Sequence, residues 1–193
     1  IEEGKSMGKA VIFDLDGTLW DSSEGIVATW ALVLEHYPEI HKKVTAEELA
    51  SNFGLPLEQI ARNMFPDQPE SLRQQLMAEC GEKENLYLAE HGGLLYPKLE
   101  ETLRNLSEKY PLFIVSNCQD GYIQSFYSGN HTEKYFKDCE CIGVTGKSKG
   151  ENIRLVMERN GLKAPVYVGD TQGDADAAAQ AGIPFIYAAY GFG

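Results

Sequence analysis

Positively charged residues are scarce in this chain of 193 residues, which has 17 Lys and Arg against 29 Asp and Glu. The formal net charge is therefore −12 at pH 7. Nucleic acids and anionic membrane surfaces are bound by clustered cationic side chains, so we expect neither as a partner. A small anion can still bind such a protein where a metal ion and one or two lysines gather.

Cysteines and long apolar runs are also sparse. The chain contains no stretch near the roughly 18 apolar residues of a membrane span, and its first residues lack the apolar core of a signal peptide. We therefore expect a cytoplasmic protein. Buried, reduced thiols are expected rather than a zinc site, because no CxxC pair or zinc-finger histidine spacing accompanies the four cysteines, Cys80, Cys118, Cys139 and Cys141.

What is present is enough apolar sequence for a core, since 43% of the residues are hydrophobic. Short apolar runs rich in β-formers alternate with helical patterns, as at residues 98–108 and 150–160, and Gly161 and Gly182 stand where helix C-caps are expected. This alternation predicts an α/β fold with a doubly wound parallel sheet. The predicted strands are residues 10–13, 112–115, 139–142, 166–168 and 184–187.

The alternation stops between residues 21 and 94, where helical patterns occur without a convincing buried strand. Asp21 with Glu24, and Thr45 with Glu48, have the spacing of capping boxes at helix starts. An apolar stripe between them is expected to pack inside a small helical domain. We therefore predict an α/β core of residues 1–20 and 95–193, and an inserted all-α cap of residues 21–94.

The segment AVIFDLDGT at residues 10–18 places Asp14 and Asp16 directly after a predicted strand. Ligands of open α/β sheets bind at such strand ends, which favours a catalytic site. A calcium loop counted from Asp14 is disfavoured, because Trp20 and Gly25 occupy its seventh and twelfth positions, where ligands are required. A turn that carries two surface acids is the other interpretation of this segment alone.

Further polar residues follow other predicted strands. Ser116 and Asn117 offer donors to an anion, although such residues also simply end strands. Asp170 and Asp174 open an Ala-rich helix, where acids also commonly oppose the helix dipole. Lys149 lies near a helix N-terminus, where the dipole disfavours a cation, so a functional role is indicated. Lys147 competes for that role, and either lysine fits an ordinary surface position.

In this order, DLDGT, SN, a lysine at a helix start and GDTQGD resemble the haloacid dehalogenase superfamily of phosphohydrolases. The resemblance spans residues 10–187, and the four motifs together are more specific than any one of them. The insertion resembles the helical cap of the branch that contains phosphoglycolate phosphatases and β-phosphoglucomutase. An acid at Asp16 is typical of the phosphatases and phosphomutases of this family rather than of its dehalogenases.

By that resemblance, Asp14 is the nucleophile and forms an aspartyl-phosphate, and Asp16 is first a general acid and then a general base. An unperturbed Asp has a pKa of about 4, so Asp14 is expected to be ionised. Mg²⁺ would be held by Asp14, the backbone carbonyl of Asp16 and Asp170, with Asp174 either a further ligand or a support. The implied phosphate-binding groups are Ser116, Lys149 and the backbone of Asn117.

The sequence thus predicts a Mg²⁺-dependent phosphatase for a small phosphorylated metabolite, as a monomer or a homodimer. A phosphomutase of the β-phosphoglucomutase type uses the same core residues and is the alternative, and a non-catalytic binding or regulatory protein is the third. A phosphonoacetaldehyde hydrolase is disfavoured, because Lys42, Lys43 and Lys83 lack familiar surroundings for a Schiff-base lysine. Substrate choice is expected from the cap, around residues 53–56 and Arg62.

Overall fold

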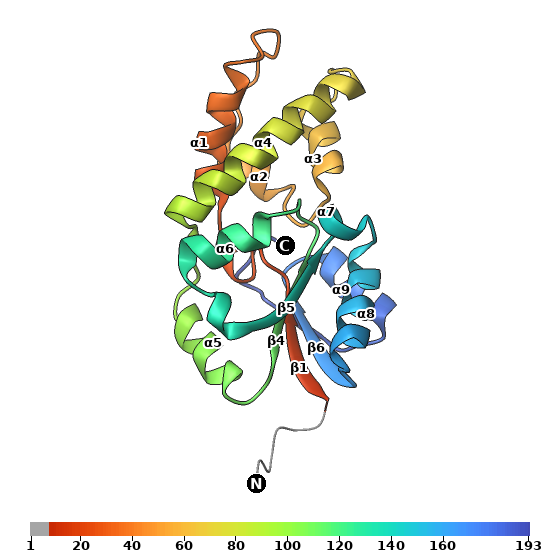
Figure 1. Ribbon diagram of the computed structural model, residues 1–193. Helices are drawn as coiled ribbons and strands as arrows, with labels where there is room; N and C mark the ends of the chain where they lie inside the picture. The colour runs from red at the N-terminus through yellow and green to blue at the C-terminus, as the bar shows by residue number, and fades with distance from the viewer. Residues whose placement is uncertain (1–7) are drawn as a thin grey trace.

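A five-stranded parallel sheet forms the centre of the protein, which the computed structural model describes for residues 8–193 (Figure 1). The strand order is β5-β4-β1-β6-β7, so the strand that leads to Asp14 lies in the middle. This confirms the predicted α/β sheet. The strands are β1 (Lys9–Phe13), β4 (Leu112–Ser116), β5 (Phe136–Cys141), β6 (Ala164–Gly169) and β7 (Phe185–Tyr187).

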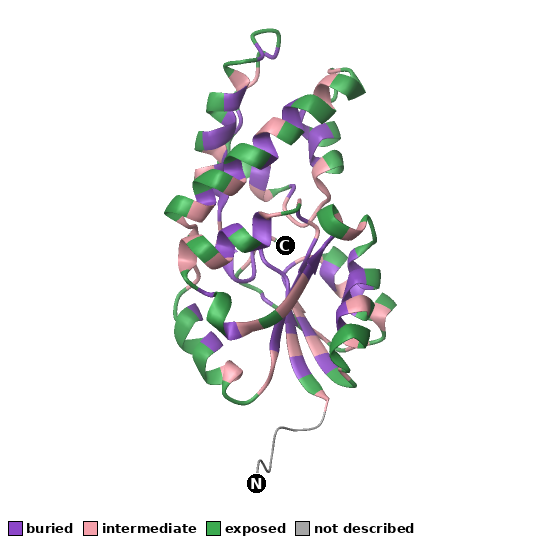
Figure 2. Ribbon diagram, in the orientation of Figure 1, coloured by how far each residue is buried: buried purple, intermediate pink, exposed green. Residues whose placement is uncertain are grey.

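Helices cover both faces of the sheet, which explains why the central strands are apolar throughout. Successive side chains of a strand point to opposite faces, so Ile12 packs toward α8 and α9, whereas Phe13 packs toward α5 and α6. Figure 2 shows the buried residues along these strands and on the inward helix faces. The helices are α5 (Leu99–Ser107), α6 (Tyr122–Asn130), α8 (Lys149–Asn160) and α9 (Gln172–Ala181).

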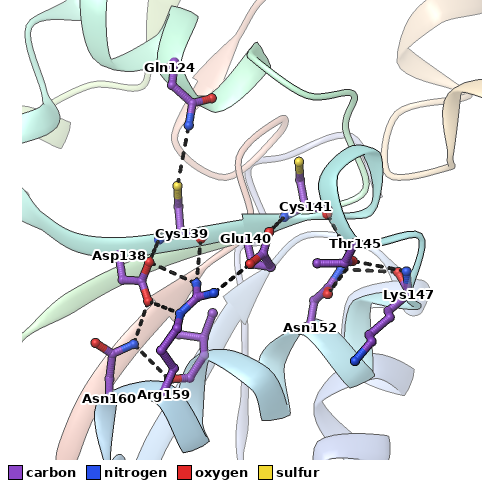
Figure 3. Close-up of polar contacts among 11 residues, drawn as sticks. Gln124, Asp138, Cys139, Glu140, Cys141, Thr145, Lys147, Asn152, Arg159 and Asn160 are labelled. Atoms are coloured by element: carbon purple, nitrogen blue, oxygen red, sulfur yellow. Dashed lines mark hydrogen bonds and ion pairs between the residues drawn. The ribbon is translucent and has the colours of Figure 1, made fainter.

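The strand predicted at 139–142 is partly wrong, because β5 begins at Phe136 and Ile142 already opens the short helix α7 (Ile142–Thr145). An edge strand tolerates charged residues, so an apolar run was a poor guide to its start. Arg159 of α8 holds this edge through Asp138 at 2.8 Å and Glu140 at 2.9 Å (Figure 3).

The inserted helices lie beyond the carboxyl ends of the strands (Figure 1). The chain leaves through β2 (Trp20–Asp21) and returns through β3 (Leu94–Leu95), which pair antiparallel. This arrangement is consistent with a core plus a cap; the exact division at 21–94 stays a prediction, and residues 1–7 of the predicted core lie outside the described residues. The helices are α1 (Ser23–Leu34), α2 (Ala46–Ala50), α3 (Leu57–Met64) and α4 (Glu70–His91).

The capping predictions had mixed outcomes. The box of Thr45 and Glu48 is present at α2, and Gly161 and Gly182 adopt left-handed conformations after α8 and α9. The box of Asp21 and Glu24 was wrong: α1 begins at Ser23, whose backbone N–H and hydroxyl both donate to the Asp21 carboxylate, at 2.9 and 2.6 Å. The N-cap of α1 is Ser22, so Asp21 lies one residue too early to form the predicted box.

The α1 stripe is buried, as predicted for packing, with Ile26, Trp30 and Val33 each at most 3% exposed. Within residues 8–193, no helix is both long enough and apolar enough to cross a membrane.

Candidate active site

Asp14 is the first residue after β1, and only 1% of it is exposed. Its backbone N–H donates to the carbonyl of Val168 on the neighbouring strand at 2.8 Å, which extends the parallel pairing into the loop. One carboxylate oxygen, Oδ1, accepts from Lys149 Nζ at 3.1 Å. The other oxygen, Oδ2, is buried and has no partner within the described part of the chain. A buried anionic oxygen without a partner is costly, which marks a place for a ligand.

Lys149 begins α8 and is 5% exposed. Its Nζ lies 2.6 Å from Asp174 Oδ1 as well as 3.1 Å from Asp14 Oδ1. Burial alone would lower the pKa of Lys149, but these two carboxylates raise it, so the lysine is charged. Lys147, the competing candidate, is exposed, and the structure brings Lys149 rather than Lys147 to the acids.

The loop before α8 aims Lys149 at the strand ends. The Thr145 hydroxyl donates to Asn152 Oδ1 at 2.7 Å, and the Asn152 amide donates to the Lys147 carbonyl at 3.2 Å (Figure 3). Ser148 then caps the helix in a capping box with Glu151. These bonds fix the first turn of α8, where the dipole would otherwise disfavour a cation.

Asp174 has both carboxylate oxygens occupied by protein donors. Oδ1 accepts from Lys149 and, at 3.3 Å, from the Tyr167 hydroxyl, while Oδ2 accepts from the backbone N–H groups of Asp170 and Thr171 at 3.0 Å each. Burial would raise the pKa of Asp174, but Lys149 and these donors hold it below its ordinary value. Asp174 is thus an ionised anchor for the lysine.

Asp170 follows β6 and is 1% exposed. Its Oδ1 accepts from the Thr18 hydroxyl at 3.2 Å, and its Oδ2 accepts from the backbone N–H of Phe192 at 2.8 Å. Burial raises the pKa of Asp170 above its ordinary value. The negative charge of this carboxylate is therefore only partly compensated by the protein.

One oxygen from each of Asp14, Asp170 and Asp174 lies within 4.8 Å of the others, so these acids could hold a metal ion. Burial and the neighbouring Asp174 raise the pKa of Asp14, although Lys149 opposes them, so the expectation of an ordinary Asp14 pKa was wrong. One lysine cannot offset three buried carboxylates. A divalent cation with a preference for oxygen, such as Mg²⁺, fits this charge and donor set.

Asp16 faces the same site from the next turn of the loop. Its Oδ1 accepts three hydrogen bonds, from Trp20 Nε1 at 2.8 Å, the Ser22 hydroxyl at 3.0 Å and the Tyr122 hydroxyl at 2.7 Å. Burial nevertheless raises its pKa to about 6, against the pull of these donors. A carboxylate with this pKa can both give and take a proton near neutral pH.

Ser116 ends β4, is 4% exposed, and lines the same cavity as Asp14 and Asp16. The Asn117 side chain turns toward the inserted helices: its amide donates to the Gly54 carbonyl at 3.0 Å, and its Oδ1 is buried without a partner in the described chain. Both residues therefore lie at the cavity, and the Asn117 amide links the α/β core to the inserted segment.

The cavity above Asp14 has a volume of about 40 Å³. Since one water needs roughly 10–15 Å³ by this kind of measure, the cavity has room for only a few waters. Core and inserted residues both line it, including Phe53, Gly54 and Leu55 of the predicted specificity loop. Arg62 is not brought to the site: it is exposed, and it pairs with Glu58 at 2.6 Å on the outer face of α3.

A model of a known protein family matches most of this chain. The family model described as "Haloacid dehalogenase-like hydrolase" matches residues 11–188. The chain belongs to this family. The aligned region includes every predicted site residue, from Asp14 to Asp174.

Relatives of this haloacid dehalogenase-like hydrolase include curated phosphatases. The chain is 26% identical to a phosphoglycolate phosphatase of Pectobacterium atrosepticum and 28% identical to one of Yersinia pestis, with 95% of this chain and 81% and 82% of those proteins covered. Its fold is similar to that of a predicted phosphoglycolate phosphatase of Haemophilus somnus (TM-score 0.83, 22% identity, 97% and 88% covered). A haloacid dehalogenase-like family hydrolase of Streptococcus pneumoniae is also similar (TM-score 0.80, 24% identity, 95% and 86% covered).

Sequence reasoning missed several residues of the site, among them Ser22, which donates to Asp16. Trp20 and Tyr122 bind Asp16 but carry no local signal of that contact. Glu84 of α4 lines the cavity and is 3% exposed. The sequence did carry a signal for Glu84, because this acidic residue interrupts a row of buried residues on α4. Cys80 lies one turn before it and Leu88 one turn after it.

Proposed function

We propose that this hydrolase is a Mg²⁺-dependent phosphatase that cleaves a small phosphomonoester through an aspartyl-phosphate on Asp14. The observation that carries the proposal is the state of Asp14: it is buried, one oxygen is held by Lys149, and the other oxygen has no partner in the described chain. A free carboxylate oxygen beside a buried cation is suited to attack on phosphorus. The names of the curated relatives agree with this class of reaction.

The residues that would hold Mg²⁺ are Asp14, Asp170 and the backbone carbonyl of Asp16. When bound, the ion would neutralise charge between the Asp14 carboxylate and the incoming phosphate. Asp174 is better suited to hold Lys149 than to bind the ion, because protein donors already occupy both of its oxygens.

In the first half-reaction, an Asp14 oxygen attacks phosphorus and the bond from phosphorus to the alcohol oxygen breaks. The leaving alkoxide takes the proton of Asp16, whose pKa of about 6 is raised by burial. In the second half-reaction, a water gives its proton to Asp16 and its oxygen attacks phosphorus. The bond from Asp14 to phosphorus then breaks, and inorganic phosphate leaves.

Lys149, Ser116 and the backbone of Asn117 would hold the phosphoryl oxygens during both steps. All three lie at the carboxyl edge of the sheet, beside Asp14 or in its cavity. Fixed donors at this place stabilise the charge that develops on the transferring group.

Residues 21–94 would act as a cap over this site. Because residues of both the core and the inserted helices line the cavity, the cap would have to move to admit an ester and to release the products. The hydrogen bond from Asn117 to the Gly54 carbonyl is one contact that opening would break. Closure would exclude bulk water while the ester is cleaved.

The test is phosphate release from small esters with and without Mg²⁺. Asp14→Asn should abolish metal-dependent release, whereas Asp176→Asn, the same charge change on the exposed face of α9, should retain it. Equal release by the Asp14→Asn variant would refute the proposal. Transfer of the phosphoryl group to a sugar phosphate instead of water would favour the phosphomutase, and Mg²⁺ binding without any turnover would favour a binding protein.

A further inference from the structure

Two chemically different groups of residues line the cavity. Asp14, Asp16 and Ser116 form the polar part of the lining, at which phosphorus would react. The remaining part, which would face the alcohol part of the substrate and is called the alcohol end below, is mostly apolar. Its apolar lining comes from the inserted helices and their loops: Ile26, Trp30, Leu49, Phe53, Leu57 and Ile60.

Glu84 is the ionisable side chain among these apolar groups. It comes from α4, is 3% exposed, and its Oε2 accepts from Trp30 Nε1 at 2.7 Å, while its Oε1 accepts from the Gln119 amide. Each oxygen therefore has one protein donor and retains capacity to accept another bond from the cavity side. Burial raises the pKa of Glu84 to about 8, so its carboxyl group is mostly protonated at pH 7 and can both donate and accept a hydrogen bond.

Basic side chains are absent from this cavity: within residues 8–193, its lining contains no Lys, Arg or His. Lys149 lies beside Asp14 and Asp174, where the phosphate would bind, and not in the apolar part of the lining. On the inserted helices, Arg62 pairs with Glu58 on the outer surface, and Lys42 lies 3.1 Å from Glu48 in the same way. The alcohol end is thus acidic or neutral, but not positive.

This charge pattern discriminates between classes of phosphate ester. A carboxylate on the alcohol part would be buried among apolar groups without a counter-charge, which is strongly unfavourable. A hydroxyl or ammonium group at the same place would donate to Glu84. A site built around such an acceptor also rejects analogues that lack the donor.

We propose that the substrate is a short phosphate ester whose alcohol part carries a hydrogen-bond donor and no carboxylate, and that Glu84 accepts from that donor. The inference rests on the proposed phosphatase function. It separates this hydrolase from the relatives named for phosphoglycolate, because the alcohol part of phosphoglycolate carries a carboxylate.

The experiment compares kcat/KM for four esters in Mg²⁺: glycerol 1-phosphate, phosphoethanolamine, propyl phosphate and 2-phosphoglycolate. We expect glycerol 1-phosphate, phosphoethanolamine or both to exceed 2-phosphoglycolate by at least about tenfold, given the cost of burying a carboxylate without a counter-charge. The hydroxyl and the ammonium ester distinguish the two kinds of donor. Propyl phosphate has neither group and should fall below the preferred donor ester.

Glu84→Gln keeps the shape of the side chain but cannot ionise when a donor such as an ammonium group binds. It should reduce the preference for the donor ester over 2-phosphoglycolate by at least about threefold, less than the loss of a full charged contact because the amide still accepts a hydrogen bond. Glu82→Gln is the matched control, since Glu82 lies on the exposed face of the same helix. The control should keep the wild-type ratio.

Binding to Asp14→Asn, measured by calorimetry with the same esters and Mg²⁺, separates this inference from the proposed function. If no ester is hydrolysed but glycerol 1-phosphate binds better than 2-phosphoglycolate, the inference stands and the phosphatase proposal fails. Best hydrolysis or tightest binding of 2-phosphoglycolate would overturn the inference and leave the phosphatase proposal intact. An unchanged ratio in Glu84→Gln would remove Glu84 from the role assigned to it.

Discussion

The Tyr122 hydroxyl should control the pH range in which Asp16 acts as an acid. It donates the shortest of the three hydrogen bonds to Asp16 Oδ1, at 2.7 Å, from a residue that is 2% exposed. A hydrogen bond to a carboxylate favours the ionised form and so lowers its pKa. Burial outweighs this effect and raises the pKa of Asp16 to about 6. Removing the hydroxyl should raise the pKa further.

The magnitude follows from the strength of the bond. A hydrogen bond to a charged group contributes roughly 1.5–3 kcal/mol, and one pKa unit corresponds to about 1.4 kcal/mol. Trp20 and Ser22 still donate to the same oxygen in Tyr122→Phe and offset part of the loss. We therefore expect a rise of about 1 pKa unit.

The assay is the pH profile of kcat/KM, which reports groups of the free enzyme. Asp16 must carry a proton to protonate the leaving alkoxide, so activity falls as pH rises through its pKa. In Tyr122→Phe this alkaline limb should move to higher pH by about 1 unit. Equal, saturating Mg²⁺ for both proteins isolates the effect of the hydroxyl.

Tyr127→Phe is the matched control, because it makes the same change on the same helix, at a residue that does not contribute to the Asp16 hydrogen bonds described above. Its profile should overlay that of the wild type. An alkaline limb that stays in place, or moves to lower pH, in Tyr122→Phe would refute the role assigned to Asp16.

Three further changes probe the charge balance. Asp16→Asn should abolish hydrolysis yet stabilise the metal-free protein by about 2–3 kcal/mol at pH 7, since the wild-type pKa is raised to about 6 from 3.8. This gain in stability should vanish toward pH 4, where Asp16 is protonated in the wild type. Urea unfolding of both proteins at pH 7 and at pH 4 checks the prediction. Lys149→Met leaves Asp14 and Asp174 without their cation and should lower the free energy of unfolding by about 3 kcal/mol at pH 7, measured by urea unfolding. An unchanged stability would contradict the ion pairs. Mg²⁺ at 100 times its Kd should stabilise the wild type by about 2.7 kcal/mol in thermal unfolding, and Asp170→Asn should show little of this effect.

Much of the fold was predictable because it is encoded locally. The apolar runs of the central strands, such as residues 112–115, are long enough to identify buried strands, and Gly161 and Gly182 mark helix ends through their backbone freedom. The edge strand β5 was only partly predicted, since solvent on one side permits charged residues. The capping box at Asp21 failed because the hydroxyl and N–H of Ser23 compete for the same carboxylate.

The candidate site was predictable in composition but not in geometry. Asp14, Asp16 and Asp170 could be named because each follows an apolar strand, and parallel strands end at one edge of the sheet. The contact of Lys149 with Asp14 spans 135 positions of the chain, and no local pattern specifies it. The choice between Lys147 and Lys149 was therefore made by the loop and the first turn of α8.

Short-range periodicity and spacing encode the alternating α/β fold, the acidic strand ends and the lysine-bearing helix start, so these features could be predicted before the structure was known. The electrostatic state of each group arises only on folding. Folding buries Asp14 beside Lys149, occupies both oxygens of Asp174, surrounds Asp16 with donors from separate elements, and places Glu84 in the lining of the cavity. Burial and charge compensation depend on neighbours in space, and local sequence does not specify those neighbours.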